Sequence, residues 1–313
     1  MKREAQMATA SAVVGGFADI LGRTVPPIDV LDIGAMAEVG GDHYDPLIVQ
    51  GLARITGFEP NPAEFKKLAG RPGPYRYLQH FLGDGGIATF HLTRYPGCAS
   101  LLEPDPSVIN LFETMGCEQD GNFRVVRTER VQTTRLDDLP PDIKADYIKI
   151  DVQGAELMIL RNGPRLLAKS LVVETEAEFI PLYRGQPLFG DLQCFLREQG
   201  FVLHKFVDLG GRPFRPVRPK NVFAPMSQAM WADAVFVRDF SRLDRYSEED
   251  LINAATILHV IYRSYDLVGV LLREFDRRQA SSLWSRYSSW LKTCDFPCTA
   301  VTLATEATAA CNA

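Results

Sequence analysis

Residues 28–35, IDVLDIGA, decide the fold class of this chain. A short run rich in Ile, Val and Leu, Ile28–Ile33, is followed by Gly34 and Ala35, and Asp32 lies next to its end. This pattern is typical of a buried strand that leads into a ligand site, because open α/β sheets bind ligands at the carboxyl ends of their strands. We therefore expect Asp32, Gly34 and Ala35 to form a cofactor-binding turn.

Six further runs of this kind follow, and stretches of helical pattern separate most of them. The seven candidate strands are Ile28–Ile33, Arg54–Phe58, Tyr75–Leu82, Tyr147–Ile150, Leu171–Val173, Phe201–Phe206 and Ala234–Val237. Alternating polar and apolar residues at Ala88–Leu92 and Arg124–Thr134 indicate a β-hairpin inserted between the third and fourth strands. The sequence thus predicts an α/β fold with a Rossmann-like, mostly parallel sheet of about seven strands.

The chain divides by pattern into four parts: a lead-in helix at 1–27, the sheet domain at 28–240, a helical extension at 241–295 and a disordered tail at 296–313. From Ser247 onward, apolar residues recur at helical spacing and predict one long amphipathic helix. The apolar stripe consists of Leu251, Ala255, Leu258, Tyr262, Tyr265 and Leu272. Such a stripe packs into a core or supports a homodimer.

The first turn favours one class of cofactor over another. A dinucleotide site would carry G-x-G-x-x-G after the first strand, and the sequence after Asp32 lacks it. S-adenosylmethionine has no phosphate, and its ammonium and sulfonium groups favour nearby acids, so it suits a D-x-G turn. Glu59, which Pro60 and Asn61 follow in a rigid turn, could accept both ribose hydroxyls. Asp84, in a glycine-rich turn, could contact the adenine amino group.

Composition excludes several other functions. A net charge of −5 argues against a nucleic-acid binder, which usually concentrates Lys and Arg. The six cysteines lack the spacing of a zinc site or a disulfide framework. No run of residues is long and apolar enough to span a membrane, and the N-terminus does not read as a signal peptide. We expect a cytoplasmic protein without membrane or nucleic-acid partners.

Longer motifs point to one family. They are RVQTTRLDDL at 130–139, DYIKIDVQGAELMILRNG at 146–163, ETEAEFIPLYRGQPLF at 174–189 and WADAVFVRD at 231–239. With these motifs in this order, the sequence resembles the FkbM family of methyltransferases. The resemblance implies S-adenosylmethionine as donor and O-methylation, often of sugars or polyketide-type natural products. It also implies that Asp32, Gly34 and Ala35 frame the methionine part of the cofactor, Glu59 the ribose and Asp84 the adenine.

Methyl transfer to an oxygen requires aligned reactants and removal of a proton, for which a carboxylate or a histidine suffices. Asp151, at the end of the fourth strand, is the first candidate for the base and also lies where it could contact the cofactor. A strand continuing through Glu174, Glu176 and Glu178 would bury three acids on one face, so we expect it to end near Glu174. Glu176 would then enter the acceptor cleft. His43, in the loop after the first strand, is the third catalytic candidate.

Carboxylates such as Asp151 and Glu176 could also hold a divalent cation, although no histidine spacing supports a metal site. Two departures from the family pattern stand out: Met36 where an Asn is common, and Gln153 where a Glu is common. The favoured function is an O-methyltransferase acting on a small hydroxylated acceptor, a sugar first. A nicotinamide-dependent oxidoreductase is disfavoured by the missing fingerprint. A non-catalytic module with this fold remains the alternative.

Overall fold

The computed structural model of the chain describes residues 16–36 and 41–294. The described residues form two compact units. One unit runs from Pro27 to Arg242, and the other combines the residues before Pro27 with those from Leu243 onward.

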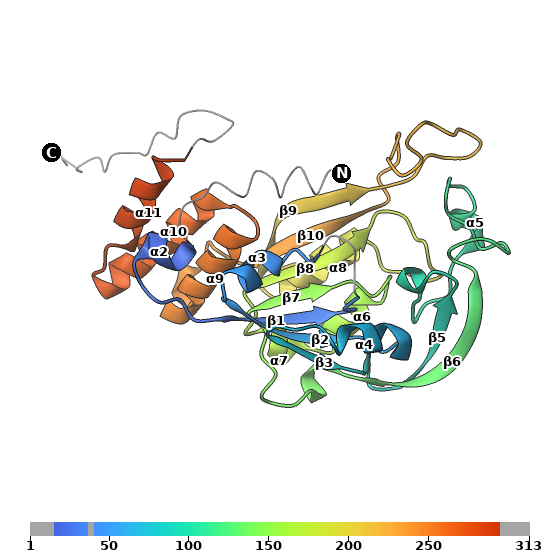
Figure 1. The fold of residues 1–313 in the computed structure, drawn as a ribbon, viewed down its shortest axis with the longest axis horizontal. Coiled ribbons are helices and arrows are strands. Elements are labelled where there is room, and N and C mark those ends of the chain that lie inside the picture. Colours follow the sequence, from blue (N-terminus) through green and yellow to red (C-terminus); the bar gives the residue numbers. More distant parts are fainter. Residues whose placement is uncertain (1–15, 37–40, 295–313) are drawn as a thin grey trace. The chain divides into compact units, whose positions relative to one another are not determined.

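The first unit is built on a seven-stranded sheet (Figure 1). Its strands, in the order in which they lie side by side, are β3 (Tyr75–Leu78), β2 (Ala53–Phe58), β1 (Ile28–Ile33), β7 (Tyr147–Ile150), β8 (Val172–Glu178), β10 (Trp231–Arg238) and β9 (Phe201–Gly210). Only β10 runs against the other six of these strands. The predicted Rossmann-like, mostly parallel sheet is therefore confirmed.

The strand order creates a topological switch between β1 and β7. From β1 the chain proceeds outward through β2 and β3, and it returns to the other side of β1 with β7. In open α/β sheets, ligands bind at the carboxyl ends of the strands beside such a switch. The turn that begins at Gly34 and the turn that begins at Asp151 meet at this place.

The two faces of the sheet differ in character near this edge. One face packs a continuous apolar core, to which Ile33, Ile150 and Phe236 contribute from the strands. On the opposite face, Asp32 is in register with Lys149. Lys149 in turn is in register with Glu174. Residues paired in register across strands share a face, so these charged side chains form a row across three strands.

Helices and short turns connect the strands. They are α3 (Asp45–Val49), α4 (Pro62–Leu68), η2 (Pro96–Cys98), α5 (Pro106–Ile109), η3 (Leu136–Asp138), α6 (Glu156–Arg161), α7 (Pro164–Leu167) and α8 (Phe189–Glu198). The start of α4 matters for the site. The Asn61 side chain accepts a hydrogen bond from the Ala63 amide at 3.0 Å, and Pro62 occupies the first helical position. Both features are preferred at a helix N-terminus, so the chain direction after β2 is well defined.

The predicted insert is confirmed as an antiparallel pair, β5 (Ile87–Thr93) and β6 (Val125–Thr134), which curves away from the main sheet (Figure 1). The single strand predicted at Tyr75–Leu82 is wrong. Its first part is β3, and its second part is β4 (Phe81–Leu82), which pairs with β6 in a separate sheet. The division occurs because Leu78 pairs with the last residue of β2, and beyond that point no strand remains for the chain to follow.

The second unit contains α2 (Phe17–Leu21), the short turn η4 (Leu243–Arg245), α9 (Glu248–Val260), α10 (Tyr265–Gln279) and α11 (Leu283–Leu291). Ser247 caps α9 in a capping box with Asp250. The single long helix predicted here is wrong, because Arg263 adopts a left-handed backbone (φ +51°) that ends the first helix.

The apolar stripe of this unit is covered by the chain itself. Leu251, Ala255, Leu258 and Leu272 are completely buried, and α9 packs against α10 and α2. The stripe therefore acts as core, and a homodimer would need other residues. Most of the predicted lead-in helix and the predicted tail lie outside the described residues.

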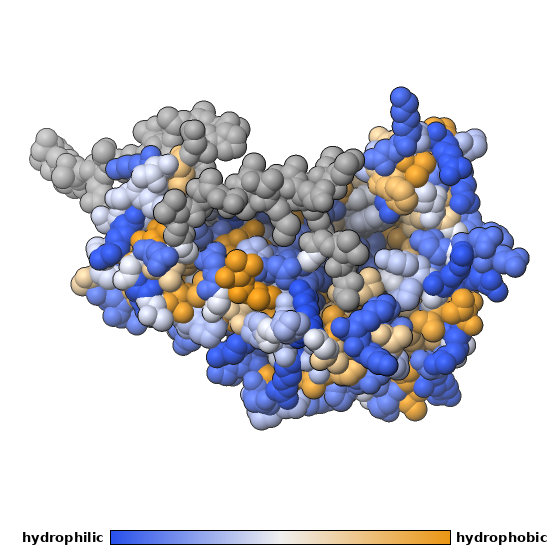
Figure 2. All heavy atoms as spheres, viewed as in Figure 1, coloured by the Kyte–Doolittle hydropathy of each residue, from blue (hydrophilic) through white to orange (hydrophobic). Residues whose placement is uncertain are grey.

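No helix in the described part of the chain combines the length and the hydrophobicity that crossing a membrane requires. On the face shown in Figure 2, hydrophilic and hydrophobic residues are interspersed.

Candidate functional site

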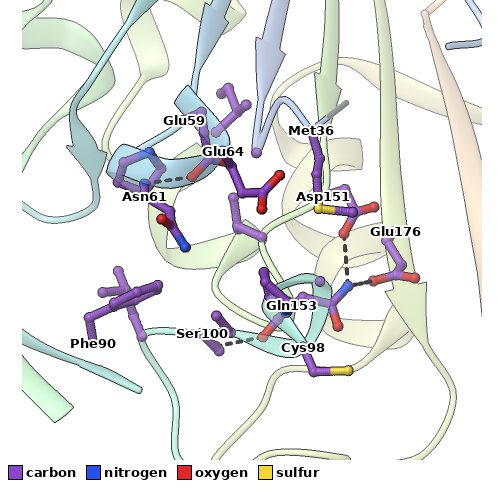
Figure 3. A pocket seen from close by; sticks show the side chains of 18 of the residues that line it. Met36, Glu59, Asn61, Glu64, Phe90, Cys98, Ser100, Asp151, Gln153 and Glu176 are labelled. Atoms are coloured by element: carbon purple, nitrogen blue, oxygen red, sulfur yellow. Dashed lines mark hydrogen bonds between the residues drawn. The ribbon is translucent and has the colours of Figure 1, made fainter. Parts of the chain in front are cut away.

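A cavity of about 440 Å³ lies at the carboxyl ends of β1, β2 and β7. Its walls come from the turns after these strands, from the insert around β4, β5 and η2, and from the ends of β8 and β10. This volume falls within the range of pockets that hold small molecules. Figure 3 shows acidic side chains from several of these elements converging on it.

Gly34 lines the cavity at a position where a side chain would not fit. Its φ is +85°, and a Cβ at this position would lie 1.9 Å from the backbone oxygen of Asp151. The Asp151 amide in turn donates to the backbone oxygen of Ile33 at 3.0 Å. The turns after β1 and β7 therefore touch, and only glycine permits this approach.

Glu59 is almost fully buried at the end of β2 and lines the cavity (Figure 3). Its Oε1 accepts a hydrogen bond from the Asn61 amide at 2.6 Å. Burial raises the pKa of Glu59 to about 7, the Asn61 amide opposes this, and the carboxylates of Glu64 and Asp32 add to it. Pro60 and Asn61 also line the cavity. The structure thus brings three predicted cofactor-binding residues together.

Asp32 and Ala35 are both buried and are not among the residues that line the cavity. Asp32 accepts a hydrogen bond from the Tyr44 hydroxyl at 2.7 Å, and Lys149 Nζ lies 3.6 Å from its Oδ1. Burial raises the pKa of Asp32 to about 6, against the opposing effect of Lys149. Asp32 therefore stabilises the turn after β1 through buried contacts outside the cavity, whereas Gly34 and Met36 line the cavity.

Asp84, predicted to contact adenine, lies on an exposed turn outside the cavity wall. Its Oδ1 accepts a hydrogen bond from the Gly86 amide at 2.8 Å, an arrangement typical of a side chain that stabilises its own turn. His80 and Leu82 line the cavity instead. The glycine-rich sequence around Asp84 indicated a turn correctly, but it did not show which residues of that turn face inward.

Asp151 and Glu176 come together through one side chain, as Figure 3 shows. Nε2 of Gln153 donates to Oδ1 of Asp151 at 2.9 Å and to Oε2 of Glu176 at 2.6 Å. Oε1 of Gln153 accepts from the Tyr183 hydroxyl at 3.1 Å. Because carboxylates can only accept, this orientation of the amide satisfies all partners. The sequence analysis noted only that Gln153 replaces a Glu common in the family, and it did not predict that Gln153 links Asp151 and Glu176.

The turn that carries Gln153 is held by buried groups. Gln153 has a left-handed backbone (φ +60°), and its backbone oxygen accepts from Ser100 Oγ at 2.7 Å. Oε1 of Glu156 accepts from the Val152 amide at 2.9 Å and from the Gly154 amide at 3.1 Å. The side chain at 153 is thereby fixed. Glu156, three residues after Gln153, could have indicated from the sequence that this turn is held in place, but the sequence analysis did not consider it.

The prediction that the fifth strand ends near Glu174 is wrong, because β8 continues to Glu178. Each of the three acids has a partner, and Glu178 is hydrogen-bonded to the Gln186 side chain. Glu174 accepts from the Tyr147 hydroxyl at 3.0 Å, and Glu176 binds Gln153. Burial, together with the charge of nearby carboxylates, raises the pKa of Glu176 and Glu178 well above the usual range. Favouring the neutral form reduces the cost of burying these side chains.

His43 lies elsewhere. Its Nδ1 is 2.7 Å from Glu174 Oε1, and its Nε2 is 2.9 Å from Asp208 Oδ2. Burial alone would lower the pKa of His43, but hydrogen bonds with these two carboxylates raise it to about 10. A charged imidazole cannot take up a proton at neutral pH. His43 is also not among the residues that line the cavity, so the structure does not bring it to Asp151 and Glu176.

Two groups of side chains place potential metal-ligand atoms within 4.8 Å of one another: His43, Glu174 and Asp233, and Asp151, Glu156 and Glu176. In the second group, Glu156 already binds two backbone amides, and the Gln153 amide already lies between the other two carboxylates. In the first group, the imidazole is protonated and engaged on both nitrogens. Neither arrangement favours a metal.

Comparison with known proteins identifies a family. The methyltransferase FkbM domain matches residues 32–203, which include the end of β1 and the whole of β2, β7 and β8. A 2-O-methyltransferase, NoeI of Sinorhizobium fredii (strain NBRC 101917 / NGR234), is 29% identical over 168 residues. That alignment covers 50% of this chain and 66% of the relative, so this chain spans less than two thirds of that protein.

Solved structures give more distant likenesses. A magnesium protoporphyrin IX methyltransferase from Synechocystis PCC 6803 is 12% identical with a TM-score of 0.34, over 68% of this chain and 71% of that one. A methyltransferase of Thermoplasma acidophilum is 11% identical with a TM-score of 0.36, over 72% and 76%. At this level of likeness, nothing known of those proteins passes to this chain.

Proposed function

Because the chain belongs to the methyltransferase FkbM family, we propose that it transfers a methyl group from S-adenosylmethionine to a hydroxyl oxygen of a small acceptor, most simply a sugar. One observation carries the proposal. The carboxylate at the end of β2, Glu59, and the linked carboxylates Asp151 and Glu176 line the same cavity at the switch point of the sheet. One end can hold a ribose and the other can receive an acceptor hydroxyl.

The cofactor end fits the proposed donor. Gly34 leaves the backbone after β1 bare, so a ligand can approach it closely. Only one oxygen of Glu59 is engaged by the Asn61 amide, so the second can accept ribose hydroxyls. When bound, S-adenosylmethionine supplies a methyl carbon activated by a positively charged sulfur. The acids around this end suit a ligand that carries positive charge.

The acceptor end supplies a base. Burial and the neighbouring Asp151 raise the pKa of Glu176, so its carboxylate holds a proton more strongly than an exposed one. A raised pKa makes the ionised carboxylate of Glu176 a stronger base toward a hydroxyl, once its own proton has left. The Gln153 amide fixes Glu176 and Asp151 in one geometry. We therefore assign proton removal to this pair and orientation of the pair to Gln153.

An oxygen acceptor is supported by the relative named a 2-O-methyltransferase, which is 29% identical to this chain over 168 residues. The chemistry of the pocket agrees, because an alcohol needs a base to release its proton whereas an already nucleophilic sulfur or nitrogen needs less help.

Turnover tests the proposal. We expect the purified protein to release S-adenosylhomocysteine from S-adenosylmethionine when D-glucose or D-glucuronate is supplied. Asp151→Asn and Glu176→Gln should each lower the rate by at least about hundredfold, the usual contribution of a general base. Asp84→Asn serves as the matched control, because Asp84 lies outside the cavity wall. Equal rates in the parent and in both cavity variants would remove the pair from catalysis.

A further inference from the structure

Arg212 stands apart from the other charged residues of the cavity. Five acids line the wall: Glu59, Glu64, Asp151, Glu176 and Glu178. Among the described residues of the wall, Arg212 is the one Lys or Arg side chain. S-adenosylmethionine carries one anionic group, the carboxylate of its methionine part, so a guanidinium in this cavity serves either that carboxylate or an anionic group of another ligand.

The guanidinium has no acidic partner in the part of the chain that the structure describes. Its Nε donates to Thr114 Oγ1 at 3.2 Å, and Nη1 donates to the backbone oxygens of Gly211 at 2.8 Å and Phe223 at 3.2 Å. These partners are neutral, so the charge remains uncompensated. Nη2, which carries two of the five N–H groups, donates to none of the described residues.

Two aromatic rings hold the Arg212 guanidinium in a fixed, partly buried position. The guanidinium carbon lies 5.0 Å from the ring centre of Trp231 and 5.3 Å from that of Phe223. Stacking on aromatic rings orients a guanidinium and leaves its edge available for hydrogen bonds. Burial lowers the pKa of Arg212, which reflects the cost of holding an unpaired cation there. An anion at its free edge would offset this cost.

Arg212 belongs to the acceptor end of the cavity. Trp231 pairs in register with Glu178 across β10 and β8, two residues along from Glu176. The buried Cys98 thiol interacts electrostatically with both Asp151 and Arg212. Burial raises the pKa of Cys98 to about 12, the charge of Asp151 raises it further, and the charge of Arg212 lowers it. Arg212 therefore lies on the side of the cavity that β8 and β10 form, whereas Glu59 follows β2 on the other side of β1.

The segment around Arg212 is basic although the whole chain is acidic. Residues 209–230 contain Arg212, Arg215, Arg218 and Lys220 and no Asp or Glu, whereas the chain carries a net charge of −5. Arg215 is used to bind the backbone oxygens of Asn110 and Met115. A local excess of positive charge beside a cavity draws anionic ligands toward it.

We propose that Arg212 binds an oxyanion of the acceptor, a carboxylate or a phosphate, so that the acceptor is an anionic hydroxyl compound rather than a neutral sugar. This inference rests on the proposed methyl transfer to a hydroxyl. At the acceptor end, Arg212 would bind the charged substituent of the acceptor, and Asp151 with Glu176 would receive its hydroxyl group. A neutral acceptor would leave the guanidinium desolvated and unpaired.

Three hexoses test this inference, namely D-glucuronate, D-glucose 6-phosphate and D-glucose. Each is titrated calorimetrically into the full chain saturated with S-adenosylhomocysteine, and again without it. We expect at least one charged hexose to bind about tenfold more tightly than glucose, the scale of a charge-assisted hydrogen bond. Which charged hexose binds better tells a carboxylate from a phosphate.

Variants assign the effect to one side chain. Arg212→Met should abolish the preference for the charged hexoses, Arg212→Lys should keep part of it, and Arg218→Met, a control in the same basic segment, should leave it unchanged. Arg218 is outside the cavity wall and lies 3.8 Å from Glu113. Binding of S-adenosylhomocysteine and the thermal midpoint show that each variant is folded.

The outcomes separate the two proposals. Weak or equal binding of all three hexoses, or a preference that survives Arg212→Met, overturns the role of Arg212. If S-adenosylhomocysteine does not bind while the charged hexoses still depend on Arg212, the oxyanion site stands and the methyltransferase cofactor does not.

Discussion

Glu176 and Asp151 share a single nitrogen, Nε2 of Gln153, which lies 2.6 Å from the first carboxylate and 2.9 Å from the second. Two carboxylates held this close repel each other, and the amide offsets that repulsion by donating one hydrogen to each. The same residue has a left-handed backbone and is fixed by Ser100. The acceptor end of the cavity therefore depends on one side chain that is itself neutral.

Replacing this amide should destabilise the fold. Gln153→Met keeps the approximate volume but removes both donors, and we expect the free energy of unfolding at pH 7 to fall by about 2 kcal/mol, the scale of lost hydrogen bonds to charged groups. The loss should shrink at pH 5, because protonation of one carboxyl relieves the repulsion. Urea denaturation at the two pH values measures this. Gln119→Met, on the exposed insert, is the control. A loss that is equal at both pH values would contradict the account.

Glu59→Gln should weaken cofactor binding without unfolding the protein. A neutral amide accepts ribose hydroxyls less strongly than a carboxylate, so the Kd for S-adenosylhomocysteine should rise by about tenfold. Asp84→Asn is the control, because Asp84 lies on an exposed turn outside the cavity wall. Calorimetric titration measures both variants. If the two variants bind alike, Glu59 has no special place in the site.

Cofactor affinity should depend on pH through the same residue. The pKa of Glu59 is raised to about 7 in the free protein, and hydroxyl donors favour its charged form. Binding should therefore tighten as the pH rises from 6 to 8, by up to about tenfold, because less of the carboxyl must lose a proton on binding. Titrations across this range measure the effect, and Glu59→Gln should flatten it. Tighter binding at low pH has the wrong sign for this mechanism.

Gly34→Ala should disrupt the contact between the turns after β1 and β7. The added Cβ would lie 1.9 Å from the backbone oxygen of Asp151, and the φ of +85° adds strain. We expect a loss of more than about 2 kcal/mol of folding stability. Gly51→Ala isolates the strain, since Gly51 has a φ of +68° but no atom within 4 Å of the added Cβ. Similar thermal midpoints for the two variants would show that the close approach does not matter.

The strands and the acids at their ends could be predicted from the sequence where local pattern determines them. The apolar run before Gly34, the acid after the second strand and the acid after the fourth strand all lie where alternating strands and helices place them. These positions follow from chain order and strand direction, which periodicity and turn residues reveal.

The remaining features depend on partners distant in sequence. The extension of β8 through Glu178 could not be predicted, because Tyr147 and Gln153, which bind its first two acids, come from β7 and the turn after it. Arg212 lies in a loop without periodicity, and only the fold brings it to the cavity. A single left-handed residue, Arg263, divided the long helix, and no residue preference marks such a position in advance.

The central claim, that the cavity at the ends of β1, β2 and β7 holds S-adenosylmethionine, is tested most directly by calorimetric titration of the purified protein. Titrations with S-adenosylhomocysteine and with NADH are compared under identical conditions. The account predicts binding of S-adenosylhomocysteine with a Kd of about micromolar order and no binding of NADH. Binding of NADH alone, or of neither ligand, would contradict it.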